Sequence, residues 1–282
     1  MSTVDLRVKA VRVRRRQLAS RVLVYGVLVL ITVVMLYPFY YMGINAFRSL
    51  DQYYAGHGFS LSTWRKLAET LPLGRQLANS TIITLGAIGL ILAVSTTGGY
   101  AFGVLRYRVW RVVFLLVLAG MMVPMQAIIA PEFINLANWG FINHRYGAIL
   151  VYAALGAPFS TFLMTTYFRR IPEDVVEAAL IDSVGYGGIF LRIMLPLALP
   201  AMFAIGVLQF IQVWDDLLVG LLFLQTPEVR PITVGLATIP SQHQLDVPLL
   251  MAGSLISALP AIAVYLVFQR YLMRGLTMGI SK

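Results

Sequence analysis

Cysteine is absent from the 282-residue chain, so it forms no disulfide and offers no thiolate to a metal. Charged residues make up only 12%, whereas soluble domains have about 25%. The only lysines are Lys9, Lys66 and Lys282, and none of them follows a glycine. A P-loop requires Gly-Lys-Ser/Thr, so the chain has no Walker A nucleotide site of its own.

Residue groups typical of catalysis are missing as well. The histidines, His57, His144 and His243, lack HExxH-like spacing and fall between the apolar segments. A hydrolytic site within an apolar segment would show a Ser/His/Asp order or paired aspartates with a neighbouring base, and the sequence shows neither. We therefore expect no catalytic residue, no metal site and no cofactor bound by this chain. An integral-membrane enzyme is the alternative from a different class.

Apolar residues dominate the composition instead, at 59% of the chain, and give a mean hydropathy of +0.79. This balance predicts a protein that lies mostly in lipid. The formal net charge is +10, but the basic residues cluster between apolar runs rather than on one soluble face. That pattern favours membrane lipid over nucleic acid as the partner of the positive charge.

Six apolar segments have the length that crosses about 30 Å of hydrocarbon as a helix, which predicts an all-α membrane protein. The first, 22–41, is too long for the core of a signal peptide and lacks a small-residue cleavage site. The third contains Pro124 and Pro131, while the second carries Gly99 and Gly103 at the spacing that lets helices pack closely. The predicted spans are 22–41, 79–105, 112–130, 146–168, 197–221 and 249–269.

The basic residues also predict an orientation. If the N-terminus is inside, most of the 22 lysines and arginines lie on the cytoplasmic side, so the positive-inside rule places both termini in the cytoplasm. We expect a basic cytoplasmic N-terminus at 1–21, a six-helix membrane domain at 22–272 and a cytoplasmic tail at 273–282. The basic residues on the outer side are then Arg48, Arg65, Lys66, Arg75, Arg145 and Arg230.

A polar stretch at 171–200 interrupts the apolar pattern between the fourth and fifth spans. Pro172 suits a first helical turn, and the acids after it suit the positive end of the helix dipole. An apolar side of this helix is formed by Val175, Val176, Ala179 and Leu180. We expect the glycines from Gly185 onward to end the helix. The charge count places the stretch in the cytoplasm. A transporter without a nucleotide site must take its energy from a partner, and an amphipathic helix is a suitable docking element.

The fifth span contains polar residues, which are costly in a membrane and often functional. Gln209, Gln212 and Asp216 recur at steps of three and four, which predicts one helical face close to Trp214. Amides and a carboxylate beside an indole suit a hydroxyl-rich solute, so we predict that these four residues line a substrate pathway. The alternative is that the glutamines bond to neighbouring helices while Asp215 and Asp216 lie at the wet end of the span.

Seven residues of the polar stretch have a spacing that resembles the EAA loop of permease subunits in bacterial ABC importers: Glu177, Ala178, Ala179, Asp182, Ile193, Leu195 and Pro196. GYAFGVLR at 99–106 resembles the start of the core helices of that superfamily. VPMQAIIAPEFINLANWGFIN, VWDDLLVGLLFL and the final QRYLMRGLTMGISK resemble the maltose-type permeases of carbohydrate importers. The likeness extends from about residue 20 to the C-terminus.

The resemblance implies the six-helix fold of type I ABC importer permeases, in the bacterial plasma membrane. It implies a subunit that moves a sugar or oligosaccharide by alternating access. The partners would be a second permease subunit in a heterodimer, two cytoplasmic ABC ATPases that use ATP and Mg, and an extracytoplasmic solute-binding protein. The coupling loop at 171–196 would contact the ATPase, the tail after Arg270 would lie near it, and the loop at about 222–248 would face the binding protein.

The sequence departs from the family pattern at two places. Ser183 stands where the family usually has glycine, and serine lacks the freedom of glycine at positive φ. We therefore predict a coupling turn, with Ser183 in it, that is shifted toward Gly185. Trp214-Asp215-Asp216 stands where the family commonly has Trp-Asn-Asp/Glu, and the extra carboxylate bears on substrate preference.

Two further alternatives remain open. The same kind of importer could carry glycerol phosphate or a polyamine, although a phosphorylated substrate favours inward-facing arginine and the predicted spans contain none. A structural membrane scaffold is the other, but it would not require the EAA spacing.

Overall fold

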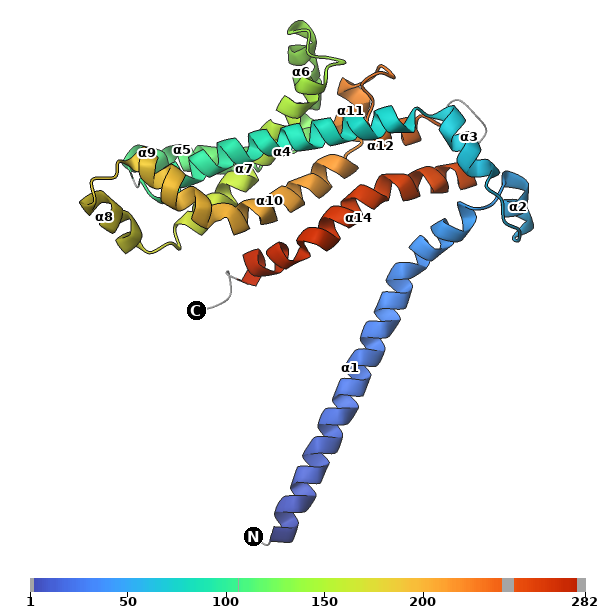
Figure 1. Cartoon of the computed structure of the whole chain (residues 1–282), viewed down its shortest axis with the longest axis horizontal. Coiled ribbons are helices and arrows are strands. Elements are labelled where there is room, and N and C mark those ends of the chain that lie inside the picture. Colours follow the sequence, from blue (N-terminus) through green and yellow to red (C-terminus); the bar gives the residue numbers. More distant parts are fainter. Residues whose placement is uncertain (1–2, 106, 240–245, 278–282) are drawn as a thin grey trace. The chain divides into compact units, whose positions relative to one another are not determined.

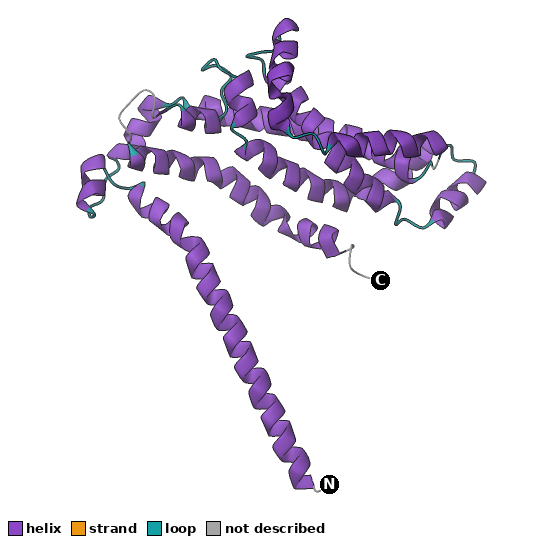
Figure 2. Cartoon of the chain, turned by 180° about the vertical axis from the view of Figure 1, so that it is seen from behind, coloured by secondary structure: helices purple, strands orange, loops and turns teal. Residues whose placement is uncertain are grey.

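A computed structural model describes residues 3–105, 107–239 and 246–277. Figure 2 shows helices joined by loops, with no strand in the described part of the chain, which confirms the all-α prediction. The chain divides into two compact units. The first comprises the residues up to Leu67 together with Asp246–Leu255, and the second comprises the remainder, from Ala68 and from Ile256 onward.

Five helices of the described residues are long and apolar enough to cross a membrane. Their spans contain or overlap five of the six predicted segments. A sixth span exists only if a bent pair of shorter helices is counted as one. The five spans are Ser20–Asn45, Leu73–Gly103, Arg145–Phe168, Tyr186–Asp215 and Val247–Tyr271.

The predicted third span, 112–130, is not one straight helix. Helix α5 (Arg108–Gly120) and helix α6 (Met125–Asn138) are bent by 98° relative to each other. Pro124 is the N-cap of α6, and proline disfavours the helical conformation in the residue before it. Pro131 lies inside α6 without ending it. The sequence placed this span at 112–130 with Pro124 and Pro131 as interruptions, and the structure confirms the interruption at Pro124 but not at Pro131.

The first unit begins with α1 (Thr3–Asn45), a single helix of 43 residues. At 1.5 Å per residue it is about 65 Å long, more than the thickness of the hydrocarbon, and the expected boundary between 1–21 and 22–272 falls inside it. Helix α2 (Leu50–Ala55) follows, with a capping box between Ser49 and Gln52, and then α3 (Ser62–Thr70).

An ion pair joins two segments of the first unit that are distant in sequence. Nζ of Lys66 on α3 lies 2.6 Å from Oδ2 of Asp246. The other carboxylate oxygen of Asp246 accepts a hydrogen bond from the backbone N–H of Leu249, in the first turn of α14 (Val247–Thr277). One aspartate thus caps α14 and binds α3. Helix α14 continues into the predicted tail at 273–282 as far as Thr277.

The second unit is built on the pairing of α4 (Leu73–Gly103) with α7 (Arg145–Phe168), against which α10 (Leu195–Asp215) packs (Figure 1). Glycine permits the close approach of the first two helices. A Cβ atom added at Gly99 would lie 2.6 Å from Cβ of Met164, and one at Gly103 would lie 3.0 Å from Cβ of Phe168. The prediction that Gly99 and Gly103 mark a helix contact is confirmed.

We expect Gly99→Ala to lower the stability of this unit by about 1–3 kcal/mol, the usual cost of overpacking. The added methyl group would also lie 3.0 Å from the backbone of Met164 and Thr165, which cannot move aside as a flexible side chain can. Gly89→Ala on the same helix is the matched control, because an added Cβ there meets nothing within 4 Å. Thermal unfolding in detergent should give a lower midpoint for the first variant only. Equal midpoints would show that the two helices can separate without cost.

The predicted fifth span, 197–221, is displaced in the structure. Helix α9 (Tyr186–Ile189), the π-helical segment η1 (Phe190–Met194) and α10 form one run that ends at Asp215. Asp216 is extended, with ψ 133°, and a short helix α11 (Leu218–Phe223) follows. The membrane helix therefore begins in the polar stretch and ends before residue 221.

Buried side chains tie the segment after α11 to the start of α4. Nδ2 of Asn79 donates to the carbonyl oxygens of Glu228 and Arg230, while its Oδ1 accepts from Nε of Arg145 at 2.8 Å. Oγ of Ser80 accepts from the N–H of Ile232, where α12 (Ile232–Ala237) begins. These bonds fix the segment up to α12 against α4 within the second unit. Residues 240–245 of the predicted outer loop at 222–248 lie outside the described residues.

Candidate functional site

The polar stretch folds as a short helix, α8 (Glu173–Ile181), that lies between α7 and α9 (Figure 1). Pro172 is its N-cap rather than its first helical residue, and Glu173 and Asp174 occupy the first turn, where the helix dipole favours acids. Ala179 is only 6% exposed, and Val176 packs beside it on an apolar cluster that includes Phe168. Val176 and Ala179 of the predicted apolar side thus pack on the membrane helices, whereas Leu180 is exposed.

Helix α8 ends in a Schellman motif centred on Ser183. The N–H of Ser183 donates to the carbonyl of Leu180, and the N–H of Val184 donates to the carbonyl of Ala179 at 2.9 Å. Ser183 itself has φ +60°, whereas Gly185 has φ −68°. The prediction that serine shifts the turn toward Gly185 was therefore wrong. The two hydrogen bonds and the apolar contact of Val184 hold serine in the conformation that glycine adopts more easily.

This conformation gives a prediction for stability. A non-glycine residue in the left-handed region costs about 1–2 kcal/mol, part of which glycine returns as unfolded-state entropy. We expect Ser183→Gly to stabilise the loop by about 0.5–1 kcal/mol, which limited proteolysis or hydrogen exchange of residues 173–184 would detect as stronger protection. Ser183→Ala, which keeps the strain, should leave protection unchanged, and a gain in the alanine variant as large as that of glycine would contradict this account.

The glycines from Gly185 onward do not end α8, contrary to the expectation from the sequence. Gly185 is the N-cap of α9, and Gly187 and Gly188 lie inside α9. The hydroxyl of Tyr100, near the end of α4, donates to the carbonyl of Tyr186 at 3.0 Å and ties α9 to the bundle. The turn is therefore held at both ends, by α8 and by α9.

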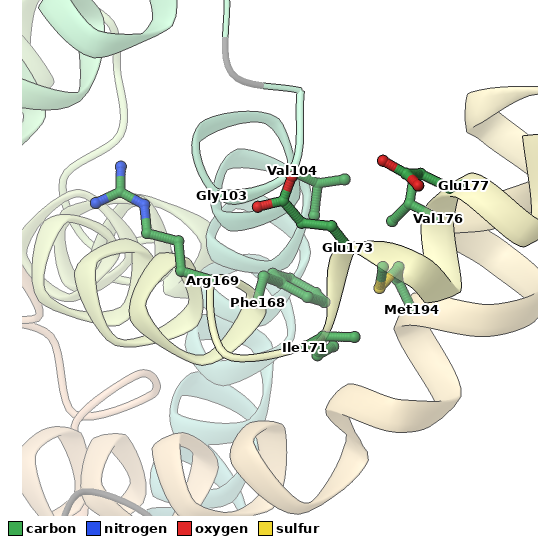
Figure 3. Close-up of a pocket in the computed structure, with 9 residues that line it drawn as sticks. All are labelled: Gly103, Val104, Phe168, Arg169, Ile171, Glu173, Val176, Glu177 and Met194. Carbon is green, nitrogen blue, oxygen red and sulfur yellow. The ribbon is translucent and has the colours of Figure 1, made fainter. Parts of the chain in front are cut away.

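A cleft of about 160 Å³ lies between α8, the last residues of α4 and α7, and Met194 (Figure 3). Glu173 and Glu177 of α8 line it together with Val176, and the opposite wall includes Gly103 and Phe168. The cleft thus combines two carboxylates with apolar walls at the junction between the loop and the membrane helices.

The predicted coupling residues divide into an exposed group and a packed group. Ala179 is buried, and Ile193 packs against the same apolar cluster with Leu195 half-buried beside it. The exposed group comprises Glu177, Ala178, Asp182, Ser183 and Pro196. The packed group connects the loop to the bundle, and the exposed group is available to a partner.

One residue of this surface was missed by the sequence analysis. Ile181 is 83% exposed, and Leu180, the residue before it, is 40% exposed. Ile181 is four residues after Glu177 and therefore lies on the acidic side of α8. An apolar residue on the polar side of an amphipathic helix is the signal that could have identified it. The exposed residues Glu177, Leu180 and Ile181 of α8 and its C-cap Asp182 are called here the α8 surface.

The predicted pathway residues of α10 do not share one environment. Gln209 is 2% exposed, and its Nε2 donates to Oγ of Ser160 on α7. Trp214 is 3% exposed, and its Nε1 donates to the carbonyl of Ser257 on α14. Gln212 is exposed. The first two residues therefore connect helices, and the third faces away from the packed bundle.

Asp216 lies beyond the end of α10, so the predicted helical face with Gln209 and Gln212 was wrong at this residue. Its Oδ1 accepts hydrogen bonds from the hydroxyl of Tyr152 and from the backbone N–H of Val219, each at 2.9 Å. Its carbonyl accepts from Oγ1 of Thr233. Asp216 thus joins α7, α11 and α12, and none of these contacts is visible in helical spacing.

Comparison with known proteins gives the same architecture. The family described as "Binding-protein-dependent transport system inner membrane component" matches residues 87–277. A solved structure titled "Crystal structure of a bacterial ABC transporter involved in the import of the acidic polysaccharide alginate" contains a similar chain. The two chains superpose with a TM-score of 0.76 at 23% identity, over 96% of this chain and 98% of that one.

Two relatives extend the comparison in sequence. The "Diacetylchitobiose uptake system permease protein NgcG" of Streptomyces coelicolor is 29% identical over 90% of this chain and 87% of its own length. The "Arabinooligosaccharides transport system permease protein AraQ" of Halalkalibacterium halodurans is 32% identical over 71% of each chain. The similarity therefore covers both the α8 loop and most of the membrane helices.

Proposed function

Because this chain belongs to the family of binding-protein-dependent transport system inner membrane components, we propose that it is the permease subunit through which an importer admits a sugar or oligosaccharide. Members of this family are membrane-spanning transport subunits and not enzymes with an ATPase site. The names of the two relatives above support a saccharide as the substrate. Neither of these two names indicates glycerol phosphate or a polyamine.

We propose further that α8 couples this subunit to an ATPase on the cytoplasmic side, where the positive-inside rule also places both termini. The observation that carries this proposal is the α8 surface, in which the exposed Ile181 stands between Glu177 and Asp182 on a helix whose other side is packed. An apolar residue within a polar rim is typical of a docking surface. Since α8 contacts the ends of α4, α7 and η1, a movement of α8 would be transmitted to the membrane helices.

The proposed assembly contains a second, non-identical permease subunit, two ATPases that use ATP and Mg, and an extracytoplasmic binding protein. An ABC importer permease requires partners of these kinds in general. The absence of a Walker A site in this chain agrees with ATP hydrolysis by a separate subunit. The segment from α11 to α12 is suited to contact a binding protein, because its bonds to Asn79 and Ser80 hold it at the opposite end of α4 from α8.

An uptake experiment tests this function. Deletion of the gene in its host is expected to abolish the accumulation of at least one member of a panel of radiolabelled saccharides. The wild-type gene should restore uptake, and a variant without residues 173–181 should insert into the membrane without restoring it. Full uptake of every saccharide in the deletion strain would reject the proposal.

Within the pathway, we propose a role in substrate contact for Gln212. Gln212 is exposed on a membrane helix, and an exposed polar group in a membrane span usually faces a water-filled path or another protein helix. Gln209, Trp214 and Asp216 would instead hold the helices that surround the path, since each is bonded to another element.

We expect Gln212→Leu to raise the KM of uptake about tenfold, as one lost hydrogen bond of about 1.4 kcal/mol would, and to leave thermal stability unchanged. Gln209→Leu is the contrasting variant, because it leaves the hydroxyl of Ser160 without its amide partner. It should lower the unfolding midpoint and affect KM little. If Gln209→Leu raised the KM and Gln212→Leu lowered the unfolding midpoint, the substrate would contact Gln209 instead.

A further inference from the structure

A second cavity, of about 550 Å³, lies beside the end of α7 and shares Gly103 and Arg169 with the cleft under α8. Its size is within the range of small-molecule sites, about 300–1,000 Å³. Three arginines and no acid occur among the described residues that line it. The side chains that matter for its chemistry are Tyr107, Arg108, Trp110, Arg111 and Arg169.

Arg169 is held in place, and it forms no ion pair with a carboxylate among the residues that the structure describes. Its Nη2 donates to the carbonyl of Phe102 at 3.2 Å, and its guanidinium lies 5.2 Å from the centre of the Phe114 ring. Figure 3 shows its side chain directed away from Glu177. A guanidinium has five N–H donors, so a carbonyl and a ring leave most of them for a ligand. The positive charge of Arg169 therefore remains available to the cavity.

The start of α5 adds two more positive charges where a helix favours negative ones. Arg108 and Arg111 lie in its first turn, which contains no acid, and the N-cap Tyr107 makes no side-chain capping bond. The dipole of a helix and its free N–H groups produce a positive potential at this end. Two exposed arginines in that potential repel the helix end and each other, and an anion bound between them would remove both costs.

We propose that this cavity binds the phosphate headgroup of an anionic phospholipid. Arginine recognises phosphate through paired N–H donors, and three guanidiniums around one cavity suit a single phosphate. The surface next to the cavity favours a membrane lipid over free phosphate as the source of the phosphate group. After Arg111, α5 exposes Val112, Leu115 and Leu116, so a path for acyl chains begins where the arginines end.

The aromatic residues of the cavity are those expected at the depth of the lipid headgroups. Tyr107 and Trp110 stand at the same end of α5 as the arginines, and such residues are enriched at the level of the headgroups.

The site does not depend on which solute is transported. Its failure would leave the proposed function intact, and a failure of the saccharide assay would leave the lipid site intact.

Native mass spectrometry of the importer, released from membranes in mild detergent, tests the proposal. We expect the wild type to retain phosphatidylglycerol in preference to phosphatidylcholine. The double variant Arg108→Gln with Arg111→Gln should bind phosphatidylglycerol about 30-fold more weakly, which corresponds to about 1 kcal/mol for each arginine near an anionic headgroup. Arg65→Gln with Arg75→Gln removes the same charge from exposed residues outside the cavity and should change nothing.

The remaining outcomes are also decisive. Arg108→Lys with Arg111→Lys keeps the charge and should retain most of the binding, which separates electrostatic recognition from a folding defect in the glutamine variant. Unchanged binding in the glutamine variant would overturn the site. Displacement of phosphatidylglycerol by an equimolar amount of inorganic phosphate would overturn the lipid source and assign the cavity to free phosphate.

Discussion

A Glu177→Lys variant is expected to reach the membrane in normal amounts and to lose at least about 30-fold of its uptake activity. Glu177 is exposed on α8 and lines the cleft between that helix and the membrane bundle. Truncation of a carboxylate that is buried against a partner protein typically costs about 2–5 kcal/mol of binding free energy, and reversal of its charge adds repulsion. The fold itself should survive, because the buried side of α8 is carried by Val176 and Ala179.

Three measurements make this result specific: uptake, the amount of chain in the membrane, and the amount of ATPase that co-purifies with it. Glu69→Lys is the matched control, since it reverses an exposed charge on α3 outside the loop. We expect it to behave like the wild type. If Glu177→Lys retained both uptake and the co-purified ATPase, the coupling function of α8 would be rejected.

Asp216→Ala is expected to destabilise the protein by about 2–4 kcal/mol, and Asp215→Ala by less than about 0.5 kcal/mol. The carboxylate of Asp216 accepts from the hydroxyl of Tyr152 and the N–H of Val219, so alanine leaves a buried hydroxyl and a helix end without their acceptor. Asp215 is exposed and has no such contact among the hydrogen bonds of the described residues. Transport should fall with the loss of stability.

A double-mutant cycle with Tyr152→Phe checks the cause. Once the hydroxyl is absent, Asp216→Ala should cost less, because part of its effect is the unpaired Tyr152. Asp216→Asn, which keeps an acceptor oxygen, should lie between the wild type and alanine. Equal unfolding midpoints for Asp215→Ala and Asp216→Ala would be evidence against the observed bonding and in favour of a simple role at the end of the helix.

The contrast between these two aspartates shows where sequence patterns stop being informative. Steps of three and four residues correctly relate side chains as long as the backbone is helical, and α10 is helical through Gln209 and Gln212. The helix ends at Asp215, and its end is stabilised by contacts from Tyr152 and Thr233, which are distant in sequence. No local pattern encodes such contacts, so the face assigned to Asp216 could not be predicted correctly.

Ser183 is the opposite case, because its low propensity for positive φ is visible in the sequence but is overridden by contacts in the fold. Serine disfavours positive φ, but the two hydrogen bonds of the Schellman motif and the contact of Val184 with the apolar cluster outweigh a cost of about 1–2 kcal/mol. The turn therefore stays at the position that the EAA spacing indicates. Pro124 was recognised as an interruption from the sequence, whereas the 98° angle between α5 and α6 was not predicted.

By itself, the sequence determined the features that depend on composition and local chemistry. The apolar segments required membrane helices, the glycines at Gly99 and Gly103 marked a close helix contact, and the lysine positions excluded a nucleotide site. Only the tertiary structure decided which polar groups are buried and where α10 ends. It also decided that Ile181 stands exposed on α8 and that Arg108 and Arg111 line a cavity. The physical reason is that hydropathy acts on each residue wherever it lies, whereas burial, capping and charge clustering depend on neighbours that the chain brings together only when it folds.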